Sequence, residues 1–248
     1  MAAPPGQFIG GSAAGGIFGM IMKARLAFLI LLLPLAACVG KSALPEDCAA
    51  NAMCAARSAE PEQLSPGQAE RHGDQLVLFP TQGQKVTFTD HLKACDDHVV
   101  ETCIGFALVD KSDRAGAFVV QQFYYEGSDF LLIDSRSGRS TTLHGMPEFS
   151  PDGSRFLVAP FDEESDVGVN NLEIWRREGD GAVLEWAHTF AQTHAEDPNL
   201  KAPYKARVSG WTYNRISLAL QEAGSDRRWR GSITRDDTGW HLSAVSPR

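Results

Sequence analysis

From Asp74 to the C-terminus, short apolar or β-branched runs alternate with clusters of Gly, Asp, Asn and Ser. Runs of this kind, bounded by turn residues, predict β-strands. In Val183–Phe190 the large side chains fall on every second position, which is the period of a strand with one covered face. The run Phe130–Ile133 is continuously apolar and predicts a strand covered on both faces. The expected strands lie at 75–79, 85–89, 103–109, 118–125, 130–133, 141–143, 155–159, 172–175, 183–190, 208–211, 216–220, 229–233 and 240–245.

These strands group into four units of similar length, at 75–110, 117–145, 147–190 and 206–246. Repeats of about 40 residues with several strands each are typical of propeller blades. The sequence therefore predicts an all-β domain at 75–248, a small propeller-like array of about four short antiparallel sheets. A β-sandwich of two facing sheets is the alternative.

One segment of the third unit carries a recognisable motif, Pro147-Glu-Phe-Ser-Pro-Asp-Gly-Ser-Arg-Phe-Leu-Val158. Pro151 presets φ for a turn, Asp152 can hydrogen-bond the backbone beyond it, and Gly153 permits positive φ. The segment resembles the repeat of the WD40-like or TolB-like β-propeller group, in which an Asp-Gly turn separates two strands. The resemblance implies a propeller fold, and the other three units depart from the motif.

The N-terminal part contains a short apolar run, Leu26–Ala37, preceded by Lys23 and Arg25. A basic segment, an apolar segment and small residues before a cleavage point are typical of a secretory signal. The run is too short for a spanning helix, which takes about 20 apolar residues. We therefore expect 1–37 to be a signal peptide, with 1–21 upstream of a true start at Met20 or Met22. We expect 38–74, rich in Ala, Pro, Glu, Gln and Gly, to be a tether or a short Ala-rich helix.

The end of this run, Leu35-Ala36-Ala37-Cys38, resembles the lipobox of bacterial lipoproteins. In that family the Cys becomes the new N-terminus and carries the lipid, so the resemblance implies lipidation at Cys38. Several acyl chains on one residue give a lasting anchor. Val39 follows in place of Asp, which in the family implies sorting to the outer membrane, facing the periplasm.

Four further cysteines remain, Cys48, Cys54, Cys95 and Cys103. An even count in an exported protein indicates disulfides, and four cysteines allow three connectivities. We favour the local pairs Cys48 with Cys54 and Cys95 with Cys103. Asp96, Asp97 and His98 raise the alternative of a metal site, but the paired short intervals of zinc sites are absent from the sequence, and we predict no metal or cofactor.

The chain has a formal net charge of −8 that is unevenly distributed. Residues 38–200 contain 12 Lys and Arg against 27 Asp and Glu, whereas residues 201–248 contain 9 against 4. This balance disfavours nucleic acid as a partner. Either the basic and acidic regions are neighbours in the fold, or the C-terminal region forms a basic patch for an anionic envelope partner.

The usual catalytic and nucleotide-binding motifs are absent from the sequence. Asp134, Ser135 and His144 include the residue types of a catalytic triad, but their context favours a turn. His188 and His194, with the acidic loop 162–166, leave open a periplasmic hydrolase as the alternative function. That loop also has oxygen ligands for Ca²⁺ but lacks the ordered spacing of a calcium loop.

The remaining candidates are large aromatic side chains that could line a binding face or belong to the core. They are Tyr124, Tyr125, Trp175, Trp211 and Trp229. With no catalytic motif, the sequence favours a lipid-anchored protein-binding or scaffolding module of the cell envelope. The expected partners are the membrane, through the lipid, and an envelope protein; the sequence does not indicate an oligomeric state.

Overall fold

The computed structural model describes residues 52–160, 171–190, 204–222, 226–243 and 246–247. The expected signal peptide, Cys38, Cys48, the acidic loop 162–166 and His194 lie outside these residues. No helix in the described segments is long and apolar enough to cross a membrane.

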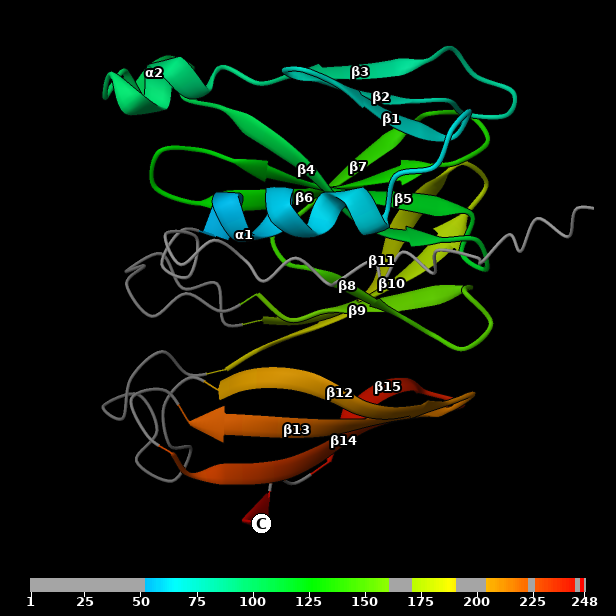
Figure 1. The fold of residues 1–248 in the computed structure, drawn as a ribbon. Helices are drawn as coiled ribbons and strands as arrows, with labels where there is room; N and C mark the ends of the chain where they lie inside the picture. Colours follow the sequence, from blue (N-terminus) through cyan, green and yellow to red (C-terminus); the bar gives the residue numbers. More distant parts are fainter. Residues whose placement is uncertain (1–51, 161–170, 191–203, 223–225, 244–245, 248) are drawn as a thin grey trace, which may run out of the picture. The chain divides into compact units, whose positions relative to one another are not determined.

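Four antiparallel sheets follow one another along the chain, each built from consecutive strands (Figure 1). The first sheet contains β1 (Ala69–His72), β2 (Gln75–Leu78) and β3 (Val86–Thr89). The second contains β4 (Gly105–Ser112), β5 (Ala117–Phe123), β6 (Ser128–Asp134) and β7 (Ser140–Leu143). The third contains β8 (Pro147–Phe149), β9 (Arg155–Val158), β10 (Asn171–Glu178) and β11 (Gly181–Thr189). The fourth contains β12 (Tyr204–Thr212), β13 (Arg215–Glu222), β14 (Arg228–Asp236), β15 (Gly239–Leu242) and β16 (Ser246–Pro247).

The predicted all-β array of four short antiparallel sheets is therefore confirmed, and the two-sheet sandwich is not what forms. Four short helical segments accompany the sheets in the described residues. They are α1 (Ala52–Ala59), the 3₁₀ turn η2 (Glu60–Glu62), α2 (Leu92–Asp96) and the 3₁₀ turn η3 (Val100–Thr102).

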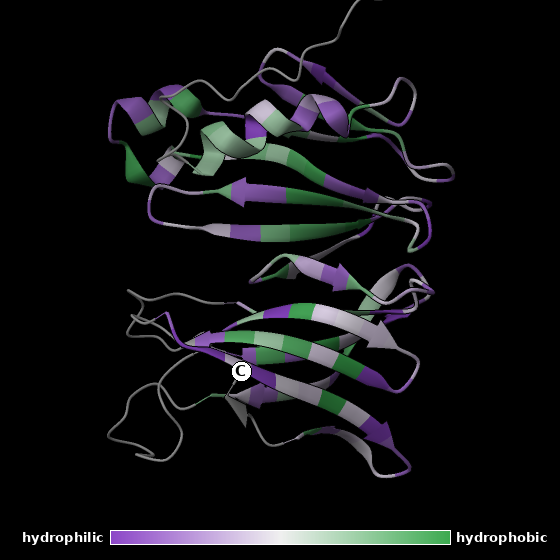
Figure 2. Ribbon diagram, turned by 60° about the horizontal axis from the view of Figure 1, so that its bottom comes forward, coloured by the Kyte–Doolittle hydropathy of each residue, from purple (hydrophilic) through white to green (hydrophobic). Residues whose placement is uncertain are grey.

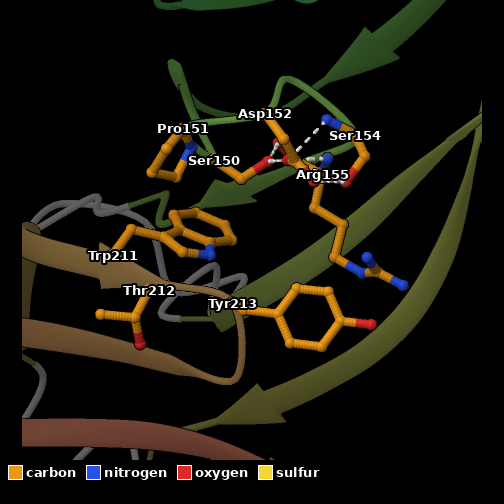
Figure 3. A pocket seen from close by; sticks show the side chains of 8 residues that line it. All are labelled: Ser150, Pro151, Asp152, Ser154, Arg155, Trp211, Thr212 and Tyr213. Atoms are coloured by element: carbon orange, nitrogen blue, oxygen red, sulfur yellow. Dashed lines mark hydrogen bonds between the residues drawn. The ribbon is translucent and has the colours of Figure 1, made fainter.

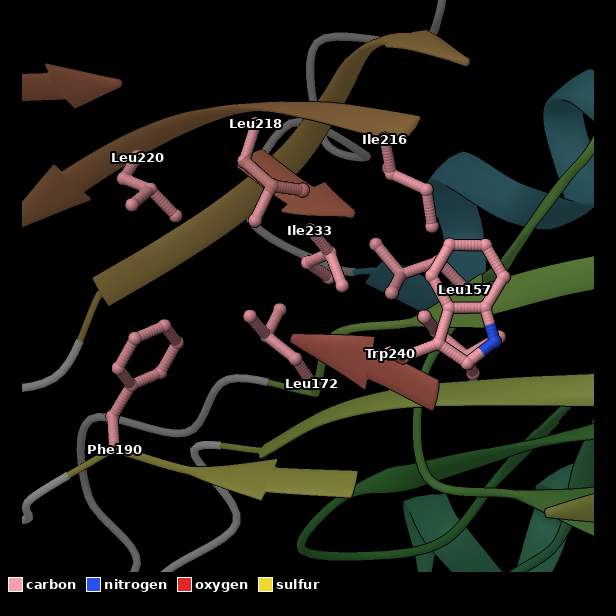
Figure 4. Close-up of a cluster of buried hydrophobic side chains, with 9 residues drawn as sticks. Leu157, Leu172, Phe190, Ile216, Leu218, Leu220, Ile233 and Trp240 are labelled. Atoms are coloured by element: carbon pink, nitrogen blue, oxygen red, sulfur yellow. The ribbon is translucent and has the colours of Figure 1, made fainter. Parts of the chain in front are cut away.

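Three apolar clusters join consecutive sheets. The first lies between sheets one and two, the second between sheets two and three, and the third between sheets three and four. Figure 4 shows the third cluster, where Leu157 and Leu172 of the third sheet meet Leu218 and Ile233 of the fourth. In the described part of the chain, no such cluster joins the fourth sheet to the first.

The two middle sheets are buried on both faces. Ile133 on β6 points into the first cluster and its neighbour Leu132 into the second. On β9, Phe156 points into the second cluster and Leu157 into the third. Successive side chains of a strand point to opposite faces, so a strand between two clusters must be apolar at every position. This explains why Phe130–Ile133 is a continuous apolar run. Hydrophobic bands accordingly cross these strands in Figure 2.

The first predicted unit, at 75–110, is placed differently in the structure. The run 103–109 belongs mostly to β4, which pairs with β5 and opens the second sheet. The first sheet is instead completed by β1, which pairs with β2. Residues 52–73, expected to belong to a tether or a short helix, form α1, η2 and β1. Strand β1 has the mostly polar sequence Ala-Glu-Arg-His, which contains no apolar pattern from which a strand could be predicted.

A buried ion network attaches this N-terminal segment to the edge strand β4. Glu60 and Asp90 are only 3% and 5% exposed. Arg71 lies between them, and its guanidinium nitrogens are 2.7 Å from a Glu60 carboxylate oxygen and 3.1 Å from an Asp90 carboxylate oxygen. The two carboxylates accept hydrogen bonds from the backbone N–H groups of Leu108 and Phe106, at 2.7 and 2.8 Å. Arg71 also donates to the Phe106 carbonyl oxygen at 2.8 Å. The network therefore satisfies backbone groups that the edge of the second sheet would otherwise leave unpaired.

The predicted Asp-Gly turn is present between β8 and β9. The Asp152 carboxylate accepts hydrogen bonds from the backbone N–H and the hydroxyl of Ser154, at 3.0 and 2.9 Å. Gly153 has a φ of 72°, as the motif requires. A Cβ at this position would lie 2.6 Å from the Arg114 carbonyl oxygen, in the β4–β5 turn of the second sheet. The turn thus serves the contact between two sheets as well as its own hairpin.

We expect Gly153→Ala to destabilise the domain more than Gly179→Ala. Both glycines have positive φ, which costs other residues roughly 1–2 kcal/mol. Only at Gly153 does the new Cβ also meet the backbone of a neighbouring sheet, because nothing lies within 4 Å of a Cβ at Gly179. Urea unfolding of both variants measures the difference. Equal losses of stability would contradict the proposed close packing of the two turns.

Candidate functional site

The described structure exposes a group of apolar and aromatic side chains beside the Cys95–Cys103 loop. Val99, Val100, Tyr124 and Tyr125 are 43%, 50%, 42% and 41% exposed, and together we call them the tyrosine surface. Tyr124 and Tyr125 lie in the turn between β5 and β6, whereas Val99 precedes the 3₁₀ turn η3 and Val100 begins it. Exposed large apolar side chains that cluster are typical of interaction sites.

The predicted disulfide between Cys95 and Cys103 closes the loop that carries the two valines. Within the loop, the backbone N–H of Val99 donates to the Ala94 carbonyl oxygen at 2.8 Å, and that of Cys103 donates to the Val99 carbonyl oxygen at 3.0 Å. The loop is closed again where His91 N–H donates to the Ile104 carbonyl oxygen at 2.8 Å. Val99 and Val100 are therefore held outward by covalent and backbone constraints. Cys54 is also disulfide-bonded, and its expected partner Cys48 lies outside the described residues.

Both tyrosines are held by hydrogen bonds. The Tyr124 hydroxyl donates to Asp129 at 3.3 Å, and the Tyr125 hydroxyl pairs with His98 Nδ1 at 2.9 Å. Burial raises the pKa of Tyr124, and the charge of Asp129 raises it further, so this hydroxyl stays protonated as a donor. The His98 and Tyr125 rings meet edge to face, with centroids 5.9 Å apart. Rigid aromatic side chains lose little conformational entropy when a partner binds them.

Two hollows flank this surface, with volumes of about 480 and 400 Å³. Tyr124, Tyr125, Gly127 and Ser128 line both, so the β5–β6 turn forms the wall between them. The larger hollow extends to the disulfide and to Met53 of α1, and the smaller one to Val100 and Asp129.

Carboxylates surround the apolar centre. Asp96, Glu101 and Glu126 are exposed and make no ion pair with another described residue. Asp97 is paired with Lys93 at 2.5 Å. An apolar centre with a charged rim is the arrangement found in protein interfaces, and this rim favours a partner with Lys or Arg around an apolar or aromatic anchor.

A third hollow, of about 170 Å³, lies between the Asp-Gly turn and the β12–β13 turn (Figure 3). Trp211 and Tyr213 face Pro151 and Asp152 across it, and Tyr213 is 81% exposed. A hydrogen bond from Ser150 and further ones from Ser154 lower the pKa of Asp152 to about 2, so it is unsuited to exchange protons near neutral pH. Arg155 is held by Glu185 at 2.7 Å. The charged groups of this hollow therefore serve the fold.

The five predicted aromatic candidates thus separate into two groups. Trp175 stacks on Phe156, with ring centroids 6.2 Å apart, and packs against the second cluster. Trp229 packs against the third cluster. Tyr124 and Tyr125 are exposed on the tyrosine surface, and Trp211 packs against the third cluster and also lines the third hollow. Sequence reasoning missed Val99 and Val100, although two adjacent valines inside a short cysteine-closed loop are a usable signal.

The residues considered for catalysis do not assemble into a site. His144 pairs with Asp129 at 3.0 Å and not with Asp134, whose oxygens are bound by Ser137 and Arg177. His188 lies between Trp186 and Phe190, and burial lowers its pKa. No carboxylate among the described residues pairs with His188, so the hydrolase alternative gains no support there. In the same part of the chain, no three His, Cys, Asp or Glu side chains gather as metal ligands.

Comparison with known proteins found no matching family model, no matching curated protein and no matching solved structure.

Asp134 instead links two sheets, which makes its ionisation a stability determinant. Burial opposes its charge, but hydrogen bonds from Ser137 and Arg136 and the charge of Arg177 outweigh burial and lower its pKa below 3.8. A lowered pKa in the folded state stabilises the protein above the unfolded pKa, and this stabilisation is lost as pH falls through the folded value.

We therefore expect Asp134→Asn to lose roughly 2 kcal/mol at pH 7 and less at the lowest pH at which the parent protein stays folded, because the advantage of the carboxylate disappears as pH falls through its lowered pKa. Urea unfolding at both pH values measures this, with the exposed Asp237→Asn as the control. A loss of equal size at both pH values would contradict the electrostatic role of Asp134.

Proposed function

We propose that this protein is a lipoprotein anchored to the outer membrane through Cys38, and that its periplasm-facing β domain binds an envelope protein through the tyrosine surface. The single observation that carries the binding role is the group of exposed, conformationally fixed side chains Val99, Val100, Tyr124 and Tyr125 between two hollows. Membrane attachment is supported by the sequence of residues 23–39.

The geometry favours binding over catalysis. The charged groups near the tyrosines, such as Asp129 and His98, are engaged in holding aromatic rings or other side chains. The rings provide apolar area with a polar tip, a combination that is enriched at protein interfaces. A partner segment with an apolar anchor would fit one of the hollows, and its basic residues would face Asp96, Glu101 or Glu126.

A photo-crosslinking residue in place of Tyr125 tests the binding role in intact envelopes. We expect it to capture one discrete partner band, because a partner on the tyrosine surface contacts this ring. The matched control is the same residue in place of Tyr213, which is exposed on a different sheet. The partner recovered from the Tyr125 adduct should then bind Tyr124→Ala/Tyr125→Ala roughly 30-fold more weakly, as loss of an interface hot spot implies. Capture at Tyr213 and not at Tyr125 would place the interface elsewhere.

Metabolic labelling with a radioactive fatty acid tests the anchor separately. We expect the wild-type chain to take up label and Cys38→Ser to take up none, because the acyl chains depend on this sulfur. Cys54→Ser is the control, since it also removes a cysteine but leaves the lipobox intact. Label retained by Cys38→Ser would contradict lipidation at this position.

A further inference from the structure

The outer face of the fourth sheet carries a group of basic side chains. In the strand register, Arg207 of β12 lies opposite Ala219 of β13, which lies opposite Arg230 of β14. In the next row, Lys205 lies opposite Gln221, which lies opposite Arg228. The rows that contain Leu218 and Leu220 alternate with these basic rows, and both leucines point into the third cluster. The basic side chains therefore point away from the third cluster, on the opposite face of the sheet.

All four basic side chains are exposed, and so is Arg215 at the far end of β13. We call Lys205, Arg207, Arg215, Arg228 and Arg230 the basic face. Arg215, Arg228 and Arg230 make no salt bridge with another residue in the described part of the chain. Arg207 lies within electrostatic range of Glu148, whose pKa is raised by burial.

Two further carboxylates lie at the ends of this face: Asp226 is two residues before Arg228, and Asp236 is two residues beyond Thr234, which lies opposite Arg215. Asp236 is six residues beyond Arg230 on β14, which is roughly 20 Å in an extended strand. Exposed charges separated by more than about 8–10 Å are largely screened at physiological ionic strength. Because its five cations outnumber the two carboxylates at its ends, the basic face is a local cationic surface on a chain of net charge −8.

We propose that the basic face docks the domain on an anionic phospholipid surface. Arg guanidinium groups match phosphate in a bidentate geometry, and four of the five cations are Arg. No Trp, Tyr or Phe is among the residues that alternate onto this face in the described strands, so it lacks the stacking platform of a nucleic-acid or sugar site. None of the three hollows described above is lined by a residue of the basic face. What remains is a pleated array of cations, suited to a flat array of phosphates.

The expected anchor strengthens this choice of occupant. If Cys38 carries lipid, the chain from there to α1 extends over at most roughly 50 Å, which keeps the domain near the membrane. The net negative charge would repel the rest of the domain from an anionic leaflet, so the basic face would also fix the orientation of the domain. The tyrosine surface, on the second sheet, would stay available to a protein partner.

Flotation with lipid vesicles tests the proposal on the full chain carrying Cys38→Ser, which excludes an acyl anchor. We compare vesicles of phosphatidylglycerol with phosphatidylcholine against vesicles of phosphatidylcholine alone, which measure any binding by the apolar run 26–37. Each Lys or Arg near an anionic surface contributes about fivefold to binding. We therefore expect Arg228→Gln/Arg230→Gln to lose at least tenfold in affinity for the anionic vesicles, and added salt to weaken wild-type binding.

The matched control is Lys85→Gln/Arg136→Gln, which removes two exposed cations from the β2–β3 and β6–β7 connections. It should bind within twofold of the parent chain, and thermal unfolding should show both double variants folded. Equal binding by the two double variants, or no preference for anionic vesicles, would overturn the proposal. The proposal would also be overturned if the parent chain bound soluble polyglutamate but no vesicles, and if Arg228→Gln/Arg230→Gln lost the polyglutamate binding. That result would indicate an acidic protein partner. None of these outcomes changes the expected crosslink at Tyr125, so the two proposals fail separately.

Discussion

The fold depends on covering both faces of the two middle sheets. Alternate residues of β6 and β9 point into different clusters, so neither sheet could be stable with one face in water. The first and fourth sheets supply the missing cover, and each keeps one face outside the clusters. This requirement orders the whole array: most large apolar side chains of the strands lie in the three clusters, and the side chains that matter for binding are left to turns, loops and the outer sheet faces. The close approach of Gly153 to the β4–β5 turn is one consequence of this tight stacking.

The edge of the second sheet shows how the array satisfies its backbone groups. An edge strand presents unpaired N–H and C=O groups that would invite another strand. On β4 these groups are bound by Glu60 of η2, Arg71 of β1 and Asp90, which directly follows β3. Removing one partner from such a buried network leaves an uncompensated charge and typically costs 3–5 kcal/mol. Arg57 of α1 also pairs with Asp90, so the network positions α1 against β4, and α1 contributes Met53 to the larger hollow at the tyrosine surface. The stability of this edge and the shape of the candidate site are therefore linked.

Much of the architecture could be predicted from residue patterns, because burial on one or two faces leaves a periodic or continuous apolar run. The strands at Phe130–Ile133 and Val183–Phe190 and the turn at Asp152–Gly153 follow from such local rules. Strand β1 does not, since it is held by the long-range ion pairs of Arg71 and by pairing with β2. The aromatic candidates show the same limit. Trp175 and Tyr125 are both large rings in β-rich segments, and only tertiary packing buries the first and exposes the second.

The uneven charge of the chain acquires a structural meaning from the positions of the free charges. The carboxylates Asp96, Glu101 and Glu126 surround the tyrosine surface, whereas the unpaired arginines of the C-terminal region share the outer face of the fourth sheet. If mutual neutralisation were the main reason for the asymmetry, these groups would pair with one another, yet Arg215, Arg228 and Arg230 have no acidic partner in the described segments. Separated surfaces of opposite sign suit a module that meets two different partners at once, a basic protein at one surface and an anionic one at the other. Because both attractions are electrostatic, each should weaken with salt, while the apolar contacts of Tyr124 and Tyr125 should persist.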